Sequence, residues 1–166
     1  MLLDLSGILA TPGASVPFSA NIDLSDLRYG KSFPVTEPVH AEGSVRNTAG
    51  VLVMTGSIST CIHGICDRCA DPFQREVFFP INAVLVRELS SEEDEDEGVY
   101  SLVGDSADLE EIVRTVFVLN LDSKLLCRED CKGLCPRCGK NLNQGPCGCR
   151  KEPDPRLAAL AQLLDK

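Results

Sequence analysis

The stretch Cys127-Arg-Glu-Asp-Cys131-Lys-Gly-Leu-Cys135-Pro-Arg-Cys138-Gly-Lys-Asn-Leu-Asn-Gln-Gly-Pro-Cys147-Gly-Cys149 decides how this chain is organised. It holds six of the nine cysteines in the sequence. Thiolates are soft ligands that suit zinc, and a structural zinc site takes four ligands arranged as a tetrahedron. So many cysteines in so short a polar stretch therefore predict a bound metal ion, with structural zinc as the first choice.

Four of the six have the best spacing for a single ion: Cys135, Cys138, Cys147 and Cys149. The first two form a C-x2-C pair that reaches one ion from a tight turn, and a glycine follows that tolerates the positive φ which often closes such a turn. The polar loop 139–146 between the two pairs could not order itself without a clip. Cys127 and Cys131 are candidates to replace or join this set.

Three other interpretations of the cysteines compete with zinc. An odd number of cysteines and a missing signal peptide argue against the disulfide cluster of a small secreted domain. The loop has too little apolar material to bury free thiols. An iron–sulfur cluster remains the main alternative to zinc, since closely spaced thiolates also hold iron.

A further pair, Cys66-x2-Cys69, lies in a β-rich setting earlier in the chain. A redox dithiol is disfavoured there, because that chemistry uses a helix N-terminus to lower the thiol pKa. Together with Cys127 and Cys131 the pair makes four thiolates, enough for a second metal site that leaves Cys61 over. The remaining interpretation is that these are buried cysteines at strand ends, without a ligand.

The chain is acidic, with 16 Lys and Arg against 25 Asp and Glu and a net charge of −9. That balance argues against a protein that binds nucleic acid with its whole surface, because phosphate contacts need local cations. Residues 123–151 differ, since they carry seven basic residues and two acidic ones, a net charge of +5. Four thiolates on one Zn²⁺ would lower this to about +3, which still suits phosphate or an acidic protein face.

The start of the chain predicts no export. The first ten residues lack a basic segment, and Asp4 interrupts their apolar run, so we expect no signal peptide. No run of ~20 apolar residues exists in the sequence, so we expect no membrane-spanning helix. Nine cysteines without an export signal indicate a reducing cytoplasm.

The apolar pattern predicts an α+β fold. Residues 39–45 and 51–60 flank Asn47-Thr-Ala-Gly50, which is typical of a hairpin. A third run, 73–86, is interrupted by Pro80, which indicates a bend or an edge position. We expect an antiparallel meander that curls toward a barrel.

Helical segments and charged runs complete this outline. Residues 108–119 predict a helix with Asp108 as its N-cap and an apolar stripe that packs on the sheet. The run Glu92–Glu97 predicts a disordered acidic loop within 88–98. Asp154-Pro155 predicts the start of a short C-terminal helix. The expected division is a β-rich core domain over 1–121 and a cysteine-rich segment with a short helix over 122–166.

The order of these segments resembles a known family. Cys66-Asp-Arg-Cys69 follows a hairpin, an acidic loop and the Asp108-Leu109 helix come next, and then Cys131-Lys-Gly-Leu-Cys135-Pro-Arg-Cys138-Gly and Asp154-Pro-Arg-Leu-Ala-Ala-Leu160. Together they resemble the YceD family, called large ribosomal RNA subunit accumulation proteins, from about Val35 to the end of the chain. Some members of that family lack most of these cysteines, so the resemblance implies that a metal clip stabilises this branch.

The resemblance implies a cytoplasmic, bacterial, non-enzymatic factor in ribosome biogenesis that supports accumulation of large-subunit (23S) ribosomal RNA. Its expected partner is that RNA or a basic ribosomal protein, with no membrane and no small-molecule substrate. The alternative is a zinc-stabilised protein-interaction module or regulator without direct RNA contact. No catalytic arrangement is evident, since a closed four-thiolate site leaves zinc no open position for water. The candidate residues for contact with RNA or a partner are Arg68, Lys132, Arg137, Lys140, Arg150 and Lys151.

Overall fold

The computed structural model describes residues 1–30, 32–87 and 98–149. Its strands are β1 (Leu2–Asp4), β2 (Ser15–Ile22), β3 (Val39–Thr48), β4 (Val51–Ile65), β5 (Pro72–Val86), β6 (Val99–Ser101) and β7 (Ser106–Asp108). Its helices are α1 (Ser6–Leu9), α2 (Leu109–Asn120) and the short 3-10 helix η2 (Leu142–Gln144). The acidic run Glu92–Glu97, the C-terminal helix expected from Asp154, and the candidate contact residues Arg150 and Lys151 lie outside the described residues.

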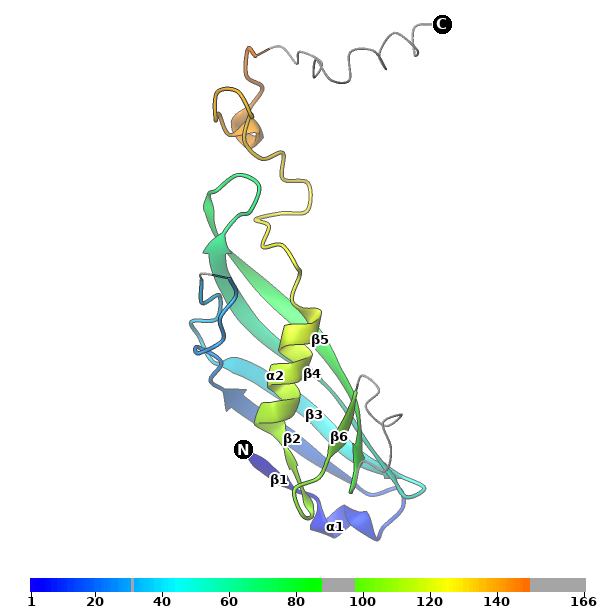
Figure 1. Ribbon diagram of the computed structural model, residues 1–166. Coiled ribbons are helices and arrows are strands. Elements are labelled where there is room, and N and C mark those ends of the chain that lie inside the picture. The colour runs from blue at the N-terminus through cyan, green and yellow to red at the C-terminus, as the bar shows by residue number, and fades with distance from the viewer. Residues whose placement is uncertain (31, 88–97, 150–166) are drawn as a thin grey trace, which may run out of the picture.

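The main sheet is mixed and open. Its strand order is β2-β3-β4-β5-β6, in which β2 to β5 pair antiparallel and the three-residue β6 runs parallel to β5. The expected curl toward a barrel is wrong, because β2 and β6 stand at opposite edges of the sheet within the described part of the chain. Figure 1 shows α2 lying over the face of the sheet. A packed helix on an open, half-buried sheet thus replaces the barrel.

The β3–β4 hairpin forms where the sequence predicts it. Ala49 and Gly50 make its two-residue turn, with φ values of 54° and 96°, the paired positive φ that matches the right-handed twist of flanking strands. The amide of Asn47, only 1% exposed, donates to the carbonyls of Ile8 and Leu9 at 2.7 and 3.0 Å. These bonds join α1 to the hairpin.

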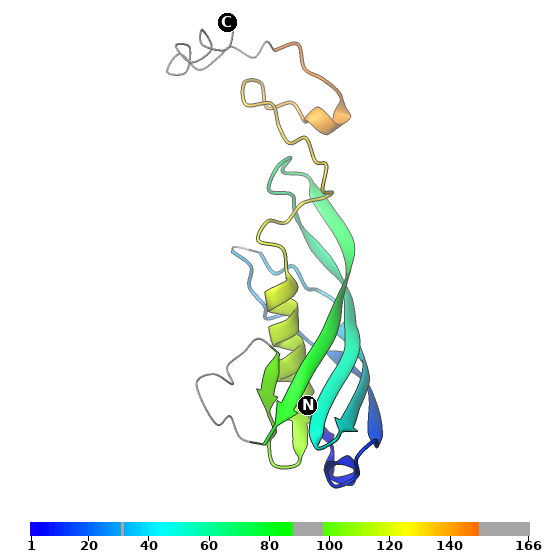
Figure 2. The ribbon, with the colours of Figure 1, turned by 90° about the vertical axis from the view of Figure 1, so that its right-hand side faces the viewer.

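The β4–β5 hairpin is the longest element and positions the cysteines. Each strand has 15 residues, and the pairing runs without a break from Leu52 opposite Leu85 to Ile65 opposite Pro72. Strand β3 accompanies β4 only as far as Ser59, so the end of the hairpin extends beyond the strands around it (Figure 2). Pro80 lies on the open edge of β5, because β6 pairs only with Val84–Val86; this confirms the edge prediction.

Helix α2 closes the core much as predicted. Asp108 caps it, with its carboxylate accepting a hydrogen bond from the amide of Glu110 at 3.0 Å. The ring of Phe117 is fully buried and meets Phe79 of β5 edge to face, with ring centroids 5.8 Å apart. The buried stripe of the helix consists of Leu109, Ile112, Val113, Val116 and Phe117. No helix in the described ranges has the length and apolar character needed to cross a membrane.

Candidate metal centres at the end of the long hairpin

The tip of the β4–β5 hairpin is a tight turn that presents two thiols on the same side. The amide of Cys66 donates to the carbonyl of Asp71 at 2.9 Å, and the amide of Ala70 donates back to the carbonyl of Cys66 at 2.9 Å. Ala70 has a φ of 58°, a conformation that costs a residue with a Cβ about 1–2 kcal/mol. The turn places Cys66 and Cys69 side by side.

A second turn repeats this geometry 69 residues later in the chain. The amide of Cys135 donates to the carbonyl of Lys140, and the amide of Gly139 donates to the carbonyl of Cys135, both at 2.9 Å. Gly139 has a φ of 70°, which confirms the expected positive φ. The two turns therefore share one hydrogen-bond pattern, with glycine in one and alanine in the other at the strained position.

The structure gathers eight of the nine cysteines into two groups of four. We call Cys66, Cys69, Cys127 and Cys131 the hairpin site, and Cys135, Cys138, Cys147 and Cys149 the terminal site. Within each group all four sulfur atoms lie within 4.8 Å of one another. The ninth cysteine, Cys61, lies apart, in a hollow of the sheet lined by Glu37, Glu76 and Phe78.

The sulfur separations fit a tetrahedral metal ion. Zn–S bonds of 2.3 Å imply a spacing of about 3.8 Å between ligand sulfurs. In the hairpin site, the Sγ atoms of Cys66 and Cys131 are 3.7 Å apart, and those of Cys69 and Cys127 are 3.8 Å apart. The donor set and its spacing therefore suit zinc.

Each group contains a thiol whose pKa is lowered to about 6 and another whose pKa is raised to about 12. Burial raises the pKa of Cys66, but three backbone N–H groups outweigh that effect and bring this pKa to about 6. Backbone N–H groups of its own turn lower the pKa of Cys135 to about 6. Burial and neighbouring sulfurs raise the pKa of Cys127 to about 12, and hydrogen bonding with Cys138, together with burial, raises that of Cys149 to about 12. A divalent cation is what would bring four thiolates together in either group.

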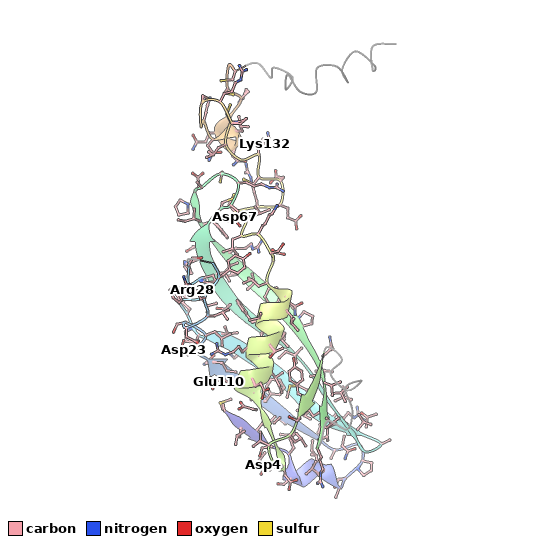
Figure 3. The ribbon with its side chains drawn as sticks, in the orientation of Figure 1. Asp4, Asp23, Arg28, Asp67, Glu110 and Lys132 are labelled. Carbon is pink, nitrogen blue, oxygen red and sulfur yellow. The ribbon has the colours of Figure 1, made fainter. Side chains whose placement is uncertain are left out.

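The hairpin tip is joined to the chain that follows α2 by a set of hydrogen bonds. Asp67 and Leu125 exchange two: the Asp67 amide donates to the Leu125 carbonyl at 2.8 Å, and the Leu125 amide donates to the Asp67 carboxylate at 2.7 Å. Figure 3 shows Asp67 and Lys132 at the same end of the molecule, opposite Asp4. These bonds bring two cysteine pairs that are 58 residues apart, as Cys69 and Cys127 are, into one group.

Arg68 takes part in the same connection. Its guanidinium Nη1 donates to the carbonyls of Glu129 and Cys131 at 3.2 and 3.0 Å, and its own carbonyl accepts from the amide of Leu134. Gly133 fits against it because a Cβ there would lie 2.9 Å from the Arg68 carbonyl oxygen. The structure thus gives this candidate contact residue a role in joining the hairpin to the cysteine-rich segment.

The other candidate cations within the described residues are Lys132, Arg137 and Lys140, and all three are exposed on the cysteine-rich segment. Lys140 donates from Nζ to the carbonyl of Pro146 at 3.0 Å, across the loop of the terminal site. Arg137 lies exposed on the second turn. Lys132 is exposed between the two sites, and its ammonium has no hydrogen bond or ion pair within residues 1–30, 32–87 and 98–149.

Sequence reasoning missed two features of this region. One is Ala70, although Cys66-Asp-Arg-Cys69-Ala-Asp aligns with Cys135-Pro-Arg-Cys138-Gly-Lys and that repeat was a usable signal. The other is Asn143 of η2, which donates to the sulfur of Cys131 at 3.3 Å. No motif marks Asn143, because its contact with Cys131 arises only when the loop of the terminal site folds against the hairpin site.

Comparison with known proteins accords with the order of these elements. The family described as "Large ribosomal RNA subunit accumulation protein YceD" matches residues 54–164. The chain belongs to the YceD family. This confirms the resemblance seen in the sequence, and the family's name refers to accumulation of large-subunit ribosomal RNA. The family is described as an accumulation factor rather than an enzyme.

Individual relatives agree with this assignment. An uncharacterised protein of Mycobacterium tuberculosis is 33% identical over 117 residues, which cover 69% of this YceD-family chain and 56% of that protein. A protein of Arabidopsis thaliana named "Large ribosomal RNA subunit accumulation protein YCED homolog 1, chloroplastic" is 24% identical over 165 residues, 82% of this chain and 51% of that protein. The chain thus spans about half the length of these relatives. No solved structure matches it.

Proposed function

We propose that this YceD-family protein is a non-enzymatic factor of the bacterial cytoplasm that supports accumulation of 23S ribosomal RNA, using the cysteine-rich end of the molecule as its contact surface. Family membership carries the role. The position of the cysteine-rich segment supports the choice of surface. It lies at the tip of a hairpin that extends beyond the sheet, away from the core (Figure 1).

Zinc orders that surface in this proposal. The terminal site supplies four cysteines around the loop 139–146, which has few apolar side chains of its own. A closed tetrathiolate site keeps no position open for water, so the ion is structural and not catalytic. The ion holds the loop 139–146 in one conformation and so positions the basic side chains beside it.

Charge limits the kind of contact. Residues 123–151 carry a net charge of +5 without metal. Two tetrathiolate zinc ions, counted with the Cys66 and Cys69 thiolates that complete the hairpin site, would bring the charge of this region to about +1. We therefore do not expect the protein to bind RNA through a broad cationic surface. A few positioned cations, Lys132 first among them, contact individual phosphates, and we expect a shallow dependence of binding on salt.

The test is recovery of the tagged protein from cells with its bound RNA and proteins, with and without nuclease. Lys132→Glu should reduce the recovered large-subunit RNA severalfold and lower the salt slope by about 1. Arg46→Glu is the matched control, since Arg46 is an exposed cation on β3 near the opposite end of the sheet.

Each outcome has a definite meaning. Large-subunit RNA that disappears with nuclease and with Lys132→Glu supports direct contact through this surface. One basic protein that survives nuclease favours the interaction-module alternative and makes the effect on RNA indirect. Equal recovery with Lys132→Glu and Arg46→Glu would reject the cysteine-rich end as the contact surface.

A further inference from the structure

We infer that the hairpin site holds a zinc ion of its own and that Asn143 couples this ion to the one in the terminal site. The metal content of the purified protein is independent of the proposed role in RNA accumulation. Support for this inference comes from how the hairpin site is built, from its burial, and from one side chain that contacts it from the loop of the other site.

The hairpin site is the more enclosed of the two. Cys66 and Cys69 are each 2% exposed and Cys131 is 4% exposed, whereas Cys138 and Cys149 of the terminal site are exposed. Phe73 and Leu126 pack against the buried sulfurs. Thiolates gathered in such surroundings need a cation to balance them, since burial without one disfavours their charge.

The hairpin site also has outer-shell hydrogen bonds, because N–H groups donate to its sulfur atoms. Metal-bound ligands are held by outer-shell donors that orient them and tune the site. Here the side-chain amide of Asn143 donates from Nδ2 to Cys131 Sγ at 3.3 Å. This hydrogen bond takes up no coordination position, so Cys131 and the three other cysteines of the site together complete the tetrahedron.

Asn143 is itself fixed by four bonds in total. Its Oδ1 accepts from the Lys132 amide at 2.9 Å and from Arg128 Nη2 at 2.8 Å. Its backbone amide donates to Asn141 Oδ1 at 2.9 Å. The two contacts on Oδ1 thus orient the side chain so that its amide N–H points at the sulfur.

Asn143 belongs to the loop that the terminal site closes. It lies in η2, between Cys138 and Cys147, whose sulfurs both point to the terminal site. Asn141, in the same loop, donates from its amide to the carboxylate of Asp71 at the hairpin tip. An ion in the terminal site fixes the loop, and the fixed loop holds Asn143 against Cys131. By thermodynamic linkage the two ions then strengthen each other's binding.

The experiment measures metal content, affinity and the environment of each ion in the full chain. We expect two zinc ions per chain by native mass spectrometry. With ¹¹³Cd in place of zinc we expect two resonances in the range of four-sulfur coordination. Substitution of Cys66 and Cys69 by serine, or of Cys147 and Cys149, assigns each resonance to its site.

Asn143→Ala should then weaken metal binding at the hairpin site about tenfold. It should also change the chemical shift of the ¹¹³Cd resonance of that site, and change the shift of the other resonance much less. Asn143→Asp keeps the acceptor for Lys132 and Arg128 but removes the N–H donor, so it should move the same resonance. Gln144→Ala, one residue along η2, is the matched control and should move neither.

Two results would overturn the inference. One is a single zinc ion per chain with Cys66 and Cys69 open to a thiol reagent in the folded protein. The other is two ions whose affinities and hairpin-site resonance are the same in the wild-type chain and in Asn143→Ala. Neither result bears on recovery of RNA, so the proposed function would fail or survive on its own test.

Discussion

At the level of single residues, Ala70 and Gly139 are a natural comparison, because they hold the same place in two turns of the same geometry. Both have positive φ, at 58° and 70°. A Cβ added at Gly139 would meet no atom within 4 Å, so an alanine there costs backbone strain alone. The same strain is already present at Ala70.

Substitutions at the two positions should therefore have opposite signs. Gly139→Ala should lower the free energy of unfolding by about 1 kcal/mol. Ala70→Gly should raise it by about 0.5 kcal/mol, since the relief of strain is partly offset by the greater freedom of an unfolded glycine. Urea unfolding of the zinc-loaded protein measures both, and equal signs would contradict the shared-turn geometry.

At the residue level, the sequence predicted which cysteines lie together where the spacing is local. Spacing alone picked out the terminal set and raised the hairpin set as one option, and the structure brings the sulfurs of each set together. Asn143 and the joining role of Arg68 were out of reach. Both depend on contacts between chain segments more than ten residues apart, which no local pattern encodes.

At the level of elements, α2 is the part whose packing can be tested most directly. Phe117 is fully buried against Phe79, whereas its neighbour Val118 is 49% exposed. The pair thus separates core packing from helix propensity at adjacent positions of one helix.

Phe117→Ala should lower the free energy of unfolding by about 3–5 kcal/mol, because it removes a buried ring and leaves a cavity. Val118→Ala should change it by less than about 0.5 kcal/mol, as substitutions at exposed positions usually do. Chemical denaturation followed by circular dichroism distinguishes the two. A small loss for Phe117→Ala would mean that α2 is not integral to the core.

The elements that the sequence predicted are those with strong local signals. The β3–β4 turn has an Asn and a Gly in the right places, and α2 has a cap and a stripe. Strand β2 was missed because its pattern is weak: only Phe18, Ala20 and Ile22 alternate inward, among small and polar residues and a proline. The expected barrel was wrong for a different reason. Closure would require the edge strands β2 and β6 to pair, and the three residues of β6 give no signal for the strand they join.

At the level of the whole molecule, the sheet and the cysteine-rich end differ in what holds them. The sheet has one contiguous apolar core, which contains most of the buried side chains. In the described residues that follow α2, Leu125 belongs to that core, and the other buried side chains are those of Cys131 and Cys135. Removal of metal should therefore affect the two parts unequally.

Treatment with a strong zinc chelator should open the segment 127–149 and leave the sheet folded, because the core needs no metal. Trypsin should then cut after exposed basic residues of that segment, Arg128 and Lys132 among them, many times faster than in the zinc-loaded protein. The strand signal in circular dichroism should persist. Protection from trypsin that is unchanged by the chelator would show that the segment is ordered without metal.

The pairing of β3 with β4 has a practical consequence for anyone who works with fragments. The family similarity begins at Met54, inside β4, yet Met54 pairs with Val45 of β3. A fragment cut at the start of the similarity would keep both cysteine groups but would lack β3, the strand that pairs with one edge of β4. The exposed, apolar edge of β4 would then pair with the same edge of another copy, and the fragment would self-associate. A well-behaved fragment needs to begin before Ser15, upstream of the sequence by which the family is recognised.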